Sequence, residues 1–120
     1  MSELLSAKQS PRYENNKFYW FEEDTFAIEL NITLTNLDTG ENILLEKGDE
    51  IIVSFYQSGI LVHKFVFDTF DNGNIVTLNF NDAVTKKFPV GEYNYTITYK
   101  GVNTTTIVAN NIAEVEKCLQ

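Results

Sequence analysis

The sequence predicts an all-β sandwich of roughly seven to nine short antiparallel strands. Apolar and polar side chains alternate along several segments, which is the pattern of strands with one buried and one exposed face. Turn residues separate these segments about every 8–12 positions, as is typical of sandwiches and barrels. No segment carries the longer apolar period of an extended helix.

The length and composition indicate one domain with its own core. The chain has 120 residues, of which 43% are hydrophobic, so it can bury a core without disulfides or metals. We expect a polar N-terminal arm over residues 1–16, because Ser10-Pro11 interrupts any helix there. We expect the sandwich over residues 17–110. Residues 111–120 are expected to form a C-terminal tail, as either a strand extension or a frayed helix.

The charge of the chain limits its partners. Seventeen acidic residues stand against nine basic ones, which gives a formal net charge of -8. Nucleic acids and anionic membranes bind surfaces rich in Lys and Arg, so neither is an expected partner. The acidic surface indicates solubility or, as the alternative, a basic partner surface.

The sequence also predicts the compartment. No stretch approaches the length of an apolar membrane span, about 20 residues, and the N-terminus lacks a signal-peptide pattern. Cys118 is the single cysteine, so no intramolecular disulfide forms. We therefore expect synthesis in a reducing, bacterial-type cytoplasm without export through a cleaved signal.

Residues 25–35 show the clearest alternation in the chain. Phe26, Ile28 and Leu30 share one face, which continues through Ile32 and Leu34, and this pattern predicts one long strand. The remaining predicted strands are residues 17–21, 50–57, 60–67, 75–80, 93–99 and 102–109. Besides the face of residues 26–34, the side chains expected in the core are Ile51, Val53, Phe55, Val76, Leu78 and Phe80.

Two short segments are predicted to close β-hairpins. Ser58-Gly59 lies between the runs 50–57 and 60–67. Asp71-Asn72-Gly73-Asn74 precedes the run 75–80, and Asn-Gly suits the positive φ angles of a two-residue loop. The second turn is therefore expected to pair residues 60–67 with residues 75–80.

The segment from Asp82 to Tyr99 is typical of immunoglobulin-like sandwiches. A short polar stretch with helical potential leads through Phe88-Pro89 to Gly91-Glu92-Tyr93, and then into an alternating strand. Such sandwiches place a Tyr at this corner, and its hydroxyl bonds to upstream backbone. Tyr93 is predicted to be the corner residue.

No group of residues predicts catalysis, so we expect a non-enzymatic protein without catalytic, cofactor-binding or metal sites. His63 is the single histidine, whereas a zinc site needs three or four ligands and a serine nucleophile needs a base. We interpret His63 as a structural or surface residue. A crowded polar loop departs from the calcium-binding spacing and is expected to be a turn. Its members are Asp68, Asp71, Asn72 and Asn74.

Two further clusters have alternative interpretations. Glu22-Glu23-Asp24 would act in glycoside hydrolysis only if its carboxylates faced each other across a cleft, and adjacent loop carboxylates usually face water. The second cluster forms either sheet packing or a sugar-stacking platform. It comprises Phe18, Tyr19, Trp20, Phe21, Tyr93, Tyr95 and Tyr99. An exposed Trp20 would favour sugar binding, and a buried Trp20 would disfavour it.

The order of the motifs resembles a known family. An aromatic strand and a long alternating strand precede GDEIIVSFY, DNGNIVTLNF and KKFPVGEYNYTITY, and a Thr-rich strand follows. Over residues 17–110, this order resembles the small immunoglobulin-like domains of tailed-bacteriophage virions of Firmicutes hosts. The resemblance includes the N-terminal domain of baseplate-upper-protein-type proteins and standalone head decoration domains. It rests on Gly48-Asp49, residues 80–88 and Gly91-x-Tyr93.

The resemblance implies a structural protein of the virion, made in the bacterial host cytoplasm. Because the chain lacks the further domains of baseplate upper proteins, a capsid decoration protein on the outer head surface is expected. Its expected partners are the major capsid protein or another virion protein, and further copies on the lattice, with residues 1–16 reaching over neighbours. A baseplate or tail accessory protein is the alternative within this class. A carbohydrate-binding module is the alternative from another class.

Overall fold

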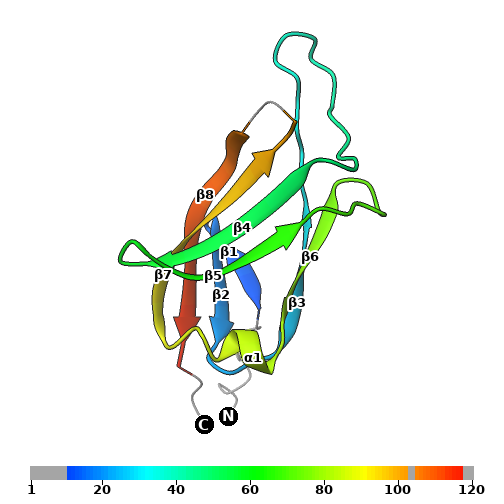
Figure 1. Ribbon diagram of the computed structural model, residues 1–120. Coiled ribbons are helices and arrows are strands. Elements are labelled where there is room, and N and C mark those ends of the chain that lie inside the picture. The colour runs from blue at the N-terminus through cyan, green and yellow to red at the C-terminus, as the bar shows by residue number, and fades with distance from the viewer. Residues whose placement is uncertain (1–10, 103–104, 118–120) are drawn as a thin grey trace, which may run out of the picture.

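The chain folds into two β-sheets that face each other (Figure 1). The computed structural model describes residues 11–102 and 105–117. The strands and the short helix of this part of the chain are β1 (Arg12–Glu14), β2 (Lys17–Phe21), β3 (Phe26–Asn31), β4 (Glu50–Gln57), β5 (Ile60–Phe67), β6 (Ile75–Phe80), α1 (Asp82–Thr85), β7 (Gly91–Lys100) and β8 (Thr105–Glu116). The predicted all-β sandwich is confirmed. Among these residues, no helix has the length and apolar character to cross a bilayer.

The larger sheet has six strands, in the order β1-β2-β8-β7-β4-β5, and the smaller sheet pairs β3 with β6. The row β5-β4-β7-β8 opposite the pair β3-β6 corresponds to strands C′, C, F and G opposite B and E of an immunoglobulin-like sandwich. One detail of the prediction is wrong, because β2 and β8 run parallel while the other pairs are antiparallel. These two strands come from opposite ends of the chain, so no hairpin imposes an antiparallel pairing.

The core lies between the two sheets, and its predicted members are confirmed. The face of residues 26–34 is buried or half-buried, and Ile51, Val53, Phe55, Val76, Leu78 and Phe80 are buried with it. The regular strand is shorter than predicted, however, because β3 ends at Asn31. Its partner β6 begins at Ile75, opposite Asn31, so no strand remains to pair with residues 32–35 in the small sheet.

At the N-terminal end, part of the predicted arm belongs to the large sheet. β1 pairs with β2 through a tight turn in which Asn15 and Asn16 adopt φ angles of 53° and 64°. Asn tolerates this left-handed region, which a two-residue hairpin turn requires. The predicted boundary at residue 17 is therefore wrong for residues 12–16, and residues 1–10 lie outside the described part of the chain.

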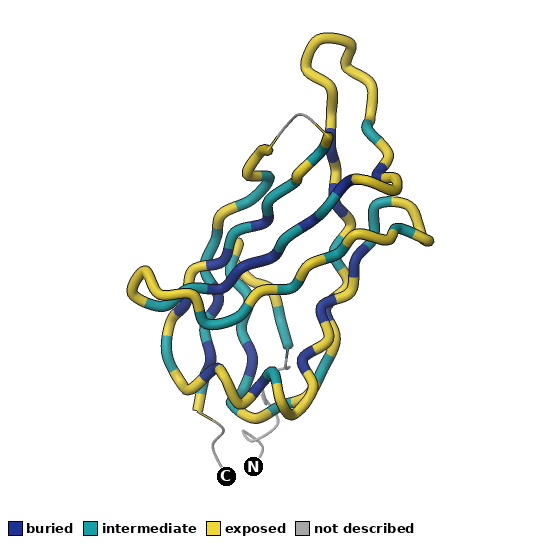
Figure 2. Tube along the Cα trace, in the orientation of Figure 1, coloured by how far each residue is buried: buried dark blue, intermediate teal, exposed yellow. Residues whose placement is uncertain are grey.

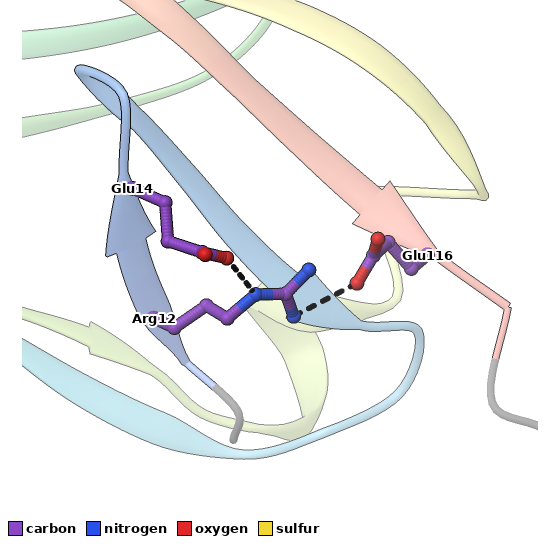
Figure 3. A network of polar contacts seen from close by, with 3 residues as sticks. All are labelled: Arg12, Glu14 and Glu116. Carbon is purple, nitrogen blue, oxygen red and sulfur yellow. Dashed lines mark hydrogen bonds and ion pairs between the residues drawn. The ribbon is translucent and has the colours of Figure 1, made fainter. Parts of the chain in front are cut away.

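An ion-pair network ties this added strand to the end of the chain (Figure 3). Arg12 Nε donates to Glu14 Oε1 at 2.6 Å, and Arg12 Nη1 lies 2.9 Å from Glu116 Oε1. Glu116 is the last residue of β8, which continues through most of the predicted tail. Of the two alternatives for residues 111–120, the strand extension is therefore correct through residue 116.

The two predicted hairpin turns have different outcomes. Ser58 and Gly59 take φ angles of 53° and 79° and join the paired strands β4 and β5, as predicted. The hairpin predicted at Asp71-Asn72-Gly73-Asn74 is wrong. A turn forms there, with Ile75 N donating to Asn72 O at 3.3 Å, but it carries the chain from the large sheet to the small sheet. Strand β6 pairs with β3 instead. In this arrangement the apolar side of each of the two strands is buried.

The predicted corner at Tyr93 is confirmed. The Tyr93 hydroxyl donates to Pro89 O at 2.6 Å, and the residue is 1% exposed. Burial raises the pKa of this phenol above its usual value. The short helix α1 precedes the corner, and its first turn is capped by the Asn81 side chain, which accepts from Val84 N at 3.0 Å. The corner thus places β7 in the large sheet directly after β6 in the small one.

Replacing Tyr93 with Phe is expected to lower the free energy of unfolding by about 1 kcal/mol. The substitution keeps the buried ring and removes the donor to Pro89 O. Urea titrations of the variant and the parent protein measure the difference. Tyr56→Phe, on the half-buried outer face of β4, is the matched control and should change stability by less than about 0.5 kcal/mol. Equal stabilities of the Tyr93→Phe and parent proteins would contradict the corner bond.

Candidate functional site

His63 lies on β5 in a contact between elements. Its Nδ1 is 3.3 Å from Lys87 Nζ, and its ring centroid is 4.7 Å from that of Phe65. Burial, and to a lesser degree the ammonium of Lys87, lowers the pKa of His63. The contact links β5 to the α1–β7 connection, which fits the interpretation of His63 as a structural residue. Across residues 11–102 and 105–117, no group of three or more His, Cys, Asp or Glu side chains is placed to hold a metal.

The crowded polar loop divides its side chains between two environments. Asp68 and Asp71 line a pocket of about 730 Å³ together with residues 47–50. Asn74 instead faces residues 32–45, where its Oδ1 accepts from Leu45 N at 2.8 Å. Because this oxygen already accepts a backbone bond, the loop does not gather its oxygens into one set of cation ligands.

The aromatic cluster belongs largely to the core. Trp20 is completely buried, and its ring centroid lies within 5.5 Å of those of Phe26, Phe80 and Phe88. Tyr93 and Tyr95 are 1% and 4% exposed. A sugar-stacking platform needs accessible ring faces, so the burial of Trp20 disfavours the carbohydrate-binding interpretation.

The acidic triplet occupies the turn between β2 and β3. Glu23 has a φ angle of 65°, and Asp24 N donates to Phe21 O at 3.2 Å. The three carboxylates are half-buried or exposed on consecutive positions of this turn. Cys118, which is the only thiol in the sequence, lies outside the described residues.

Residues 32–45 form a projecting hairpin that the sequence did not predict, and we call it the finger (Figures 1 and 2). Thr35 bridges Asn42, and Ile43 N donates to Leu34 O at 2.8 Å, so the two sides of the finger are hydrogen-bonded to each other. At the tip, Asn36 N donates to Glu41 O at 2.8 Å, and Asn36 Oδ1 accepts from Asp38 N at 2.9 Å. The finger is therefore an ordered element with its own turn.

The root of the finger is anchored in the core. Ile32, Leu34 and Leu45 are 5%, 8% and 3% exposed. The Asn74 side chain crosses between the two sides of the root, because Nδ2 donates to Ile32 O at 3.0 Å and to Ile43 O at 2.8 Å while Oδ1 holds Leu45 N. At the root, where no neighbouring strand supplies hydrogen-bond partners, the backbone groups thus obtain them from the Asn74 side chain.

The outer part of the finger carries apolar side chains in water. Leu37 at the tip is 95% exposed, and Leu44 is 70% exposed. The surroundings are acidic: residues 32–50 and 68–73 hold seven carboxylates and a single lysine, Lys47. The carboxylates are those of Asp38, Glu41, Glu46, Asp49, Glu50, Asp68 and Asp71. We call this region the acidic end, and it combines exposed leucines with most of the net charge of the chain.

The arrangement suits binding to another surface. A hairpin with fixed internal bonds loses little conformational entropy when its tip is buried, so exposed apolar side chains there contribute more of their burial free energy to binding. The partial signal in the sequence was the apolar run at residues 42–45 between two turns. That run does not by itself show which of its side chains face water.

Comparisons of the chain with protein-family models, with curated proteins and with solved structures found no match.

Proposed function

We propose that this protein is a non-enzymatic structural protein of a tailed-bacteriophage virion that decorates the outer surface of the capsid. The observation that carries the proposal is the finger, an ordered hairpin that holds Leu37 and Leu44 in water on a rigid sandwich. A decoration protein needs such a stable module with preformed contact elements, and on a lattice such an element can also join neighbouring copies. The major capsid protein is the proposed partner, since a shell offers many equivalent copies and repeated weak contacts add up to firm attachment.

The corner segment supports the family side of this proposal. The sequence resemblance to virion domains rests partly on residues 80–88 and Gly91-x-Tyr93. These residues form α1 and the hydrogen-bonded Tyr93 corner of an immunoglobulin-like sandwich. This agreement supports the fold that the resemblance implies, and the virion setting is inferred from it. A baseplate or tail accessory protein is the second candidate, because the same resemblance includes baseplate domains.

Cryo-electron microscopy of particles from a lysogen carrying this gene tests the proposal. We expect density of the size of this sandwich to repeat over the outer capsid surface. Particles from a matched strain with the gene deleted are the control and should lack that density. Density restricted to the tail tip would transfer the assignment to the baseplate. Absence of the protein from purified particles would overturn the proposal.

A further inference from the structure

A second surface of this acidic chain has the opposite character to the finger. Residues 57–67 and 83–91 contain no carboxylate and carry Lys64, Lys86 and Lys87 in addition to His63. Four apolar side chains of these segments are about half-exposed or more. They are Ile60 at 71%, Leu61 at 47%, Val66 at 49% and Val90 at 48%. We call this region the basic patch.

The two segments of the basic patch lie against each other. Lys87 Nζ is 3.3 Å from His63 Nδ1, which joins the α1–β7 connection to β5. At the start of β7, a Cβ built on Gly91 would lie 2.9 Å from Gln57 Nε2, so the backbone there is in close contact with the end of β4. The turn at Ser58-Gly59 and the α1–β7 connection therefore lie beside each other, while the side chains of Lys64 and Val66 alternate to the other face of β5.

The finger and the basic patch complement each other in charge and in apolar character. The finger presents Leu37 and Leu44 beside Asp38 and Glu41, and the patch presents Ile60, Leu61 and Val90 beside lysines. Opposite charges at the rim of an apolar contact favour association and set its orientation. Within one molecule, the finger tip lies far from both α1 and the β4–β5 turn (Figure 1), so the finger does not reach these parts of the patch of its own chain.

We infer that a second copy of this chain binds the finger, with the finger of one molecule seated on the basic patch of the next. Because the two contacting surfaces differ, the contact is head-to-tail. An open assembly leaves one finger free at one end and one patch free at the other. Such contacts close into a ring if the rotation between copies allows it, and otherwise extend into a chain. The inference does not depend on a virion setting, because it needs only the protein itself.

Sedimentation equilibrium of the purified protein tests the inference. We expect the average mass to rise above that of the monomer and beyond that of a dimer between about 10 µM and 1 mM, a range suited to a small interface. Leu37→Lys blocks the finger, and Leu61→Ser weakens the patch. Each variant alone should self-associate about tenfold more weakly or worse. Val102→Ser is the matched control, because Val102 is 83% exposed and belongs to neither the finger nor the basic patch, and it should behave as the parent protein.

Mixing the two variants distinguishes this geometry from a symmetric contact. The intact finger of Leu61→Ser fits the intact patch of Leu37→Lys, so the equimolar mixture should form a dimer and stop there. Unchanged melting temperatures of the single variants show that the fold is kept. A parent protein that stays monomeric throughout the range would overturn the inference. It would equally be overturned by Leu37→Lys associating as the parent does, or by a mixture that fails to dimerise.

Discussion

Replacing Asn74 with Ala is expected to lower the free energy of unfolding by about 2–4 kcal/mol. The side chain of Asn74 satisfies three backbone groups at the finger root, namely Leu45 N, Ile32 O and Ile43 O. Ile32 and Leu45 are 5% and 3% exposed, so water does not readily replace the lost partners. Each unsatisfied buried group costs about 1–3 kcal/mol, and partial opening of the finger would relieve some of that cost.

Two further substitutions separate the hydrogen bonds from other effects at this turn. Asn74→Asp retains an acceptor for Leu45 N but turns a carboxylate oxygen toward the carbonyls of Ile32 and Ile43. It should therefore be no more stable than Asn74→Ala at neutral pH. Asn72→Ala changes an exposed side chain of the same turn and should cost less than about 0.5 kcal/mol.

Urea titration followed by tryptophan fluorescence measures these differences, because Trp20 is the only tryptophan and is completely buried. Hydrogen exchange at the Leu45 amide reports the finger root separately. If Asn74→Ala were as stable as Asn72→Ala and its Leu45 amide remained protected, the anchoring of the finger by Asn74 would be wrong.

The sequence predicted the strands well wherever each strand follows from its own residues. The predicted strands at residues 17–21, 50–57, 60–67 and 75–80 match β2, β4, β5 and β6. In β3 and β6 the apolar period of two directly marks the buried face, and the corner at Tyr93 follows from a local sequence of turn residues. Local pattern and final structure agree here because both depend on the same alternation of side chains.

Features that depend on distant partners were not predictable in this way. The pairing of β1 with β2 depends on a turn at Asn15-Asn16 within a polar segment, and its tie to β8 depends on Glu116, far along the chain. The Asn-Gly pair at residues 72–73 predicted a hairpin because it suits the positive φ angles of a two-residue hairpin loop. Its neighbour Asn74 bonds across to the finger root instead, and no short-range pattern contains that contact.

The same reason explains why the candidate interaction surfaces were missed. Leu37 and Leu44 look like ordinary apolar residues near turns, and their exposure follows from a finger that lies outside the sandwich. The basic patch is likewise made of two segments separated in sequence, which meet only through the Lys87–His63 contact and the Gly91–Gln57 approach. The net charge of -8 predicts an acidic protein but conceals the uneven distribution of its charges.

Replacing Phe80 with Ala is expected to destabilise the protein by about 3–5 kcal/mol, the range for a fully buried aromatic residue. Phe80 is 0% exposed on β6 of the small sheet. Its ring centroid lies 5.1 Å from that of Trp20, 5.9 Å from that of Phe55 and 5.3 Å from that of Phe65. These partners belong to β2, β4 and β5 of the large sheet, so one side chain joins the small sheet to three strands of the large one.

The small sheet consists of β3 and β6, and neither strand is paired with a strand of the large sheet. Its attachment to the large sheet therefore depends on side-chain packing of this kind rather than on inter-strand hydrogen bonds. Phe80→Leu should recover a substantial part of the loss because it refills most of the cavity. Phe67→Ala is the matched control: this half-buried residue on β5 stacks on Phe65 at 6.5 Å and should lose less than half as much stability. Urea titrations compare the variants at equal m-values. If Phe80→Ala cost no more than Phe67→Ala, the two sheets would be held together elsewhere in the core.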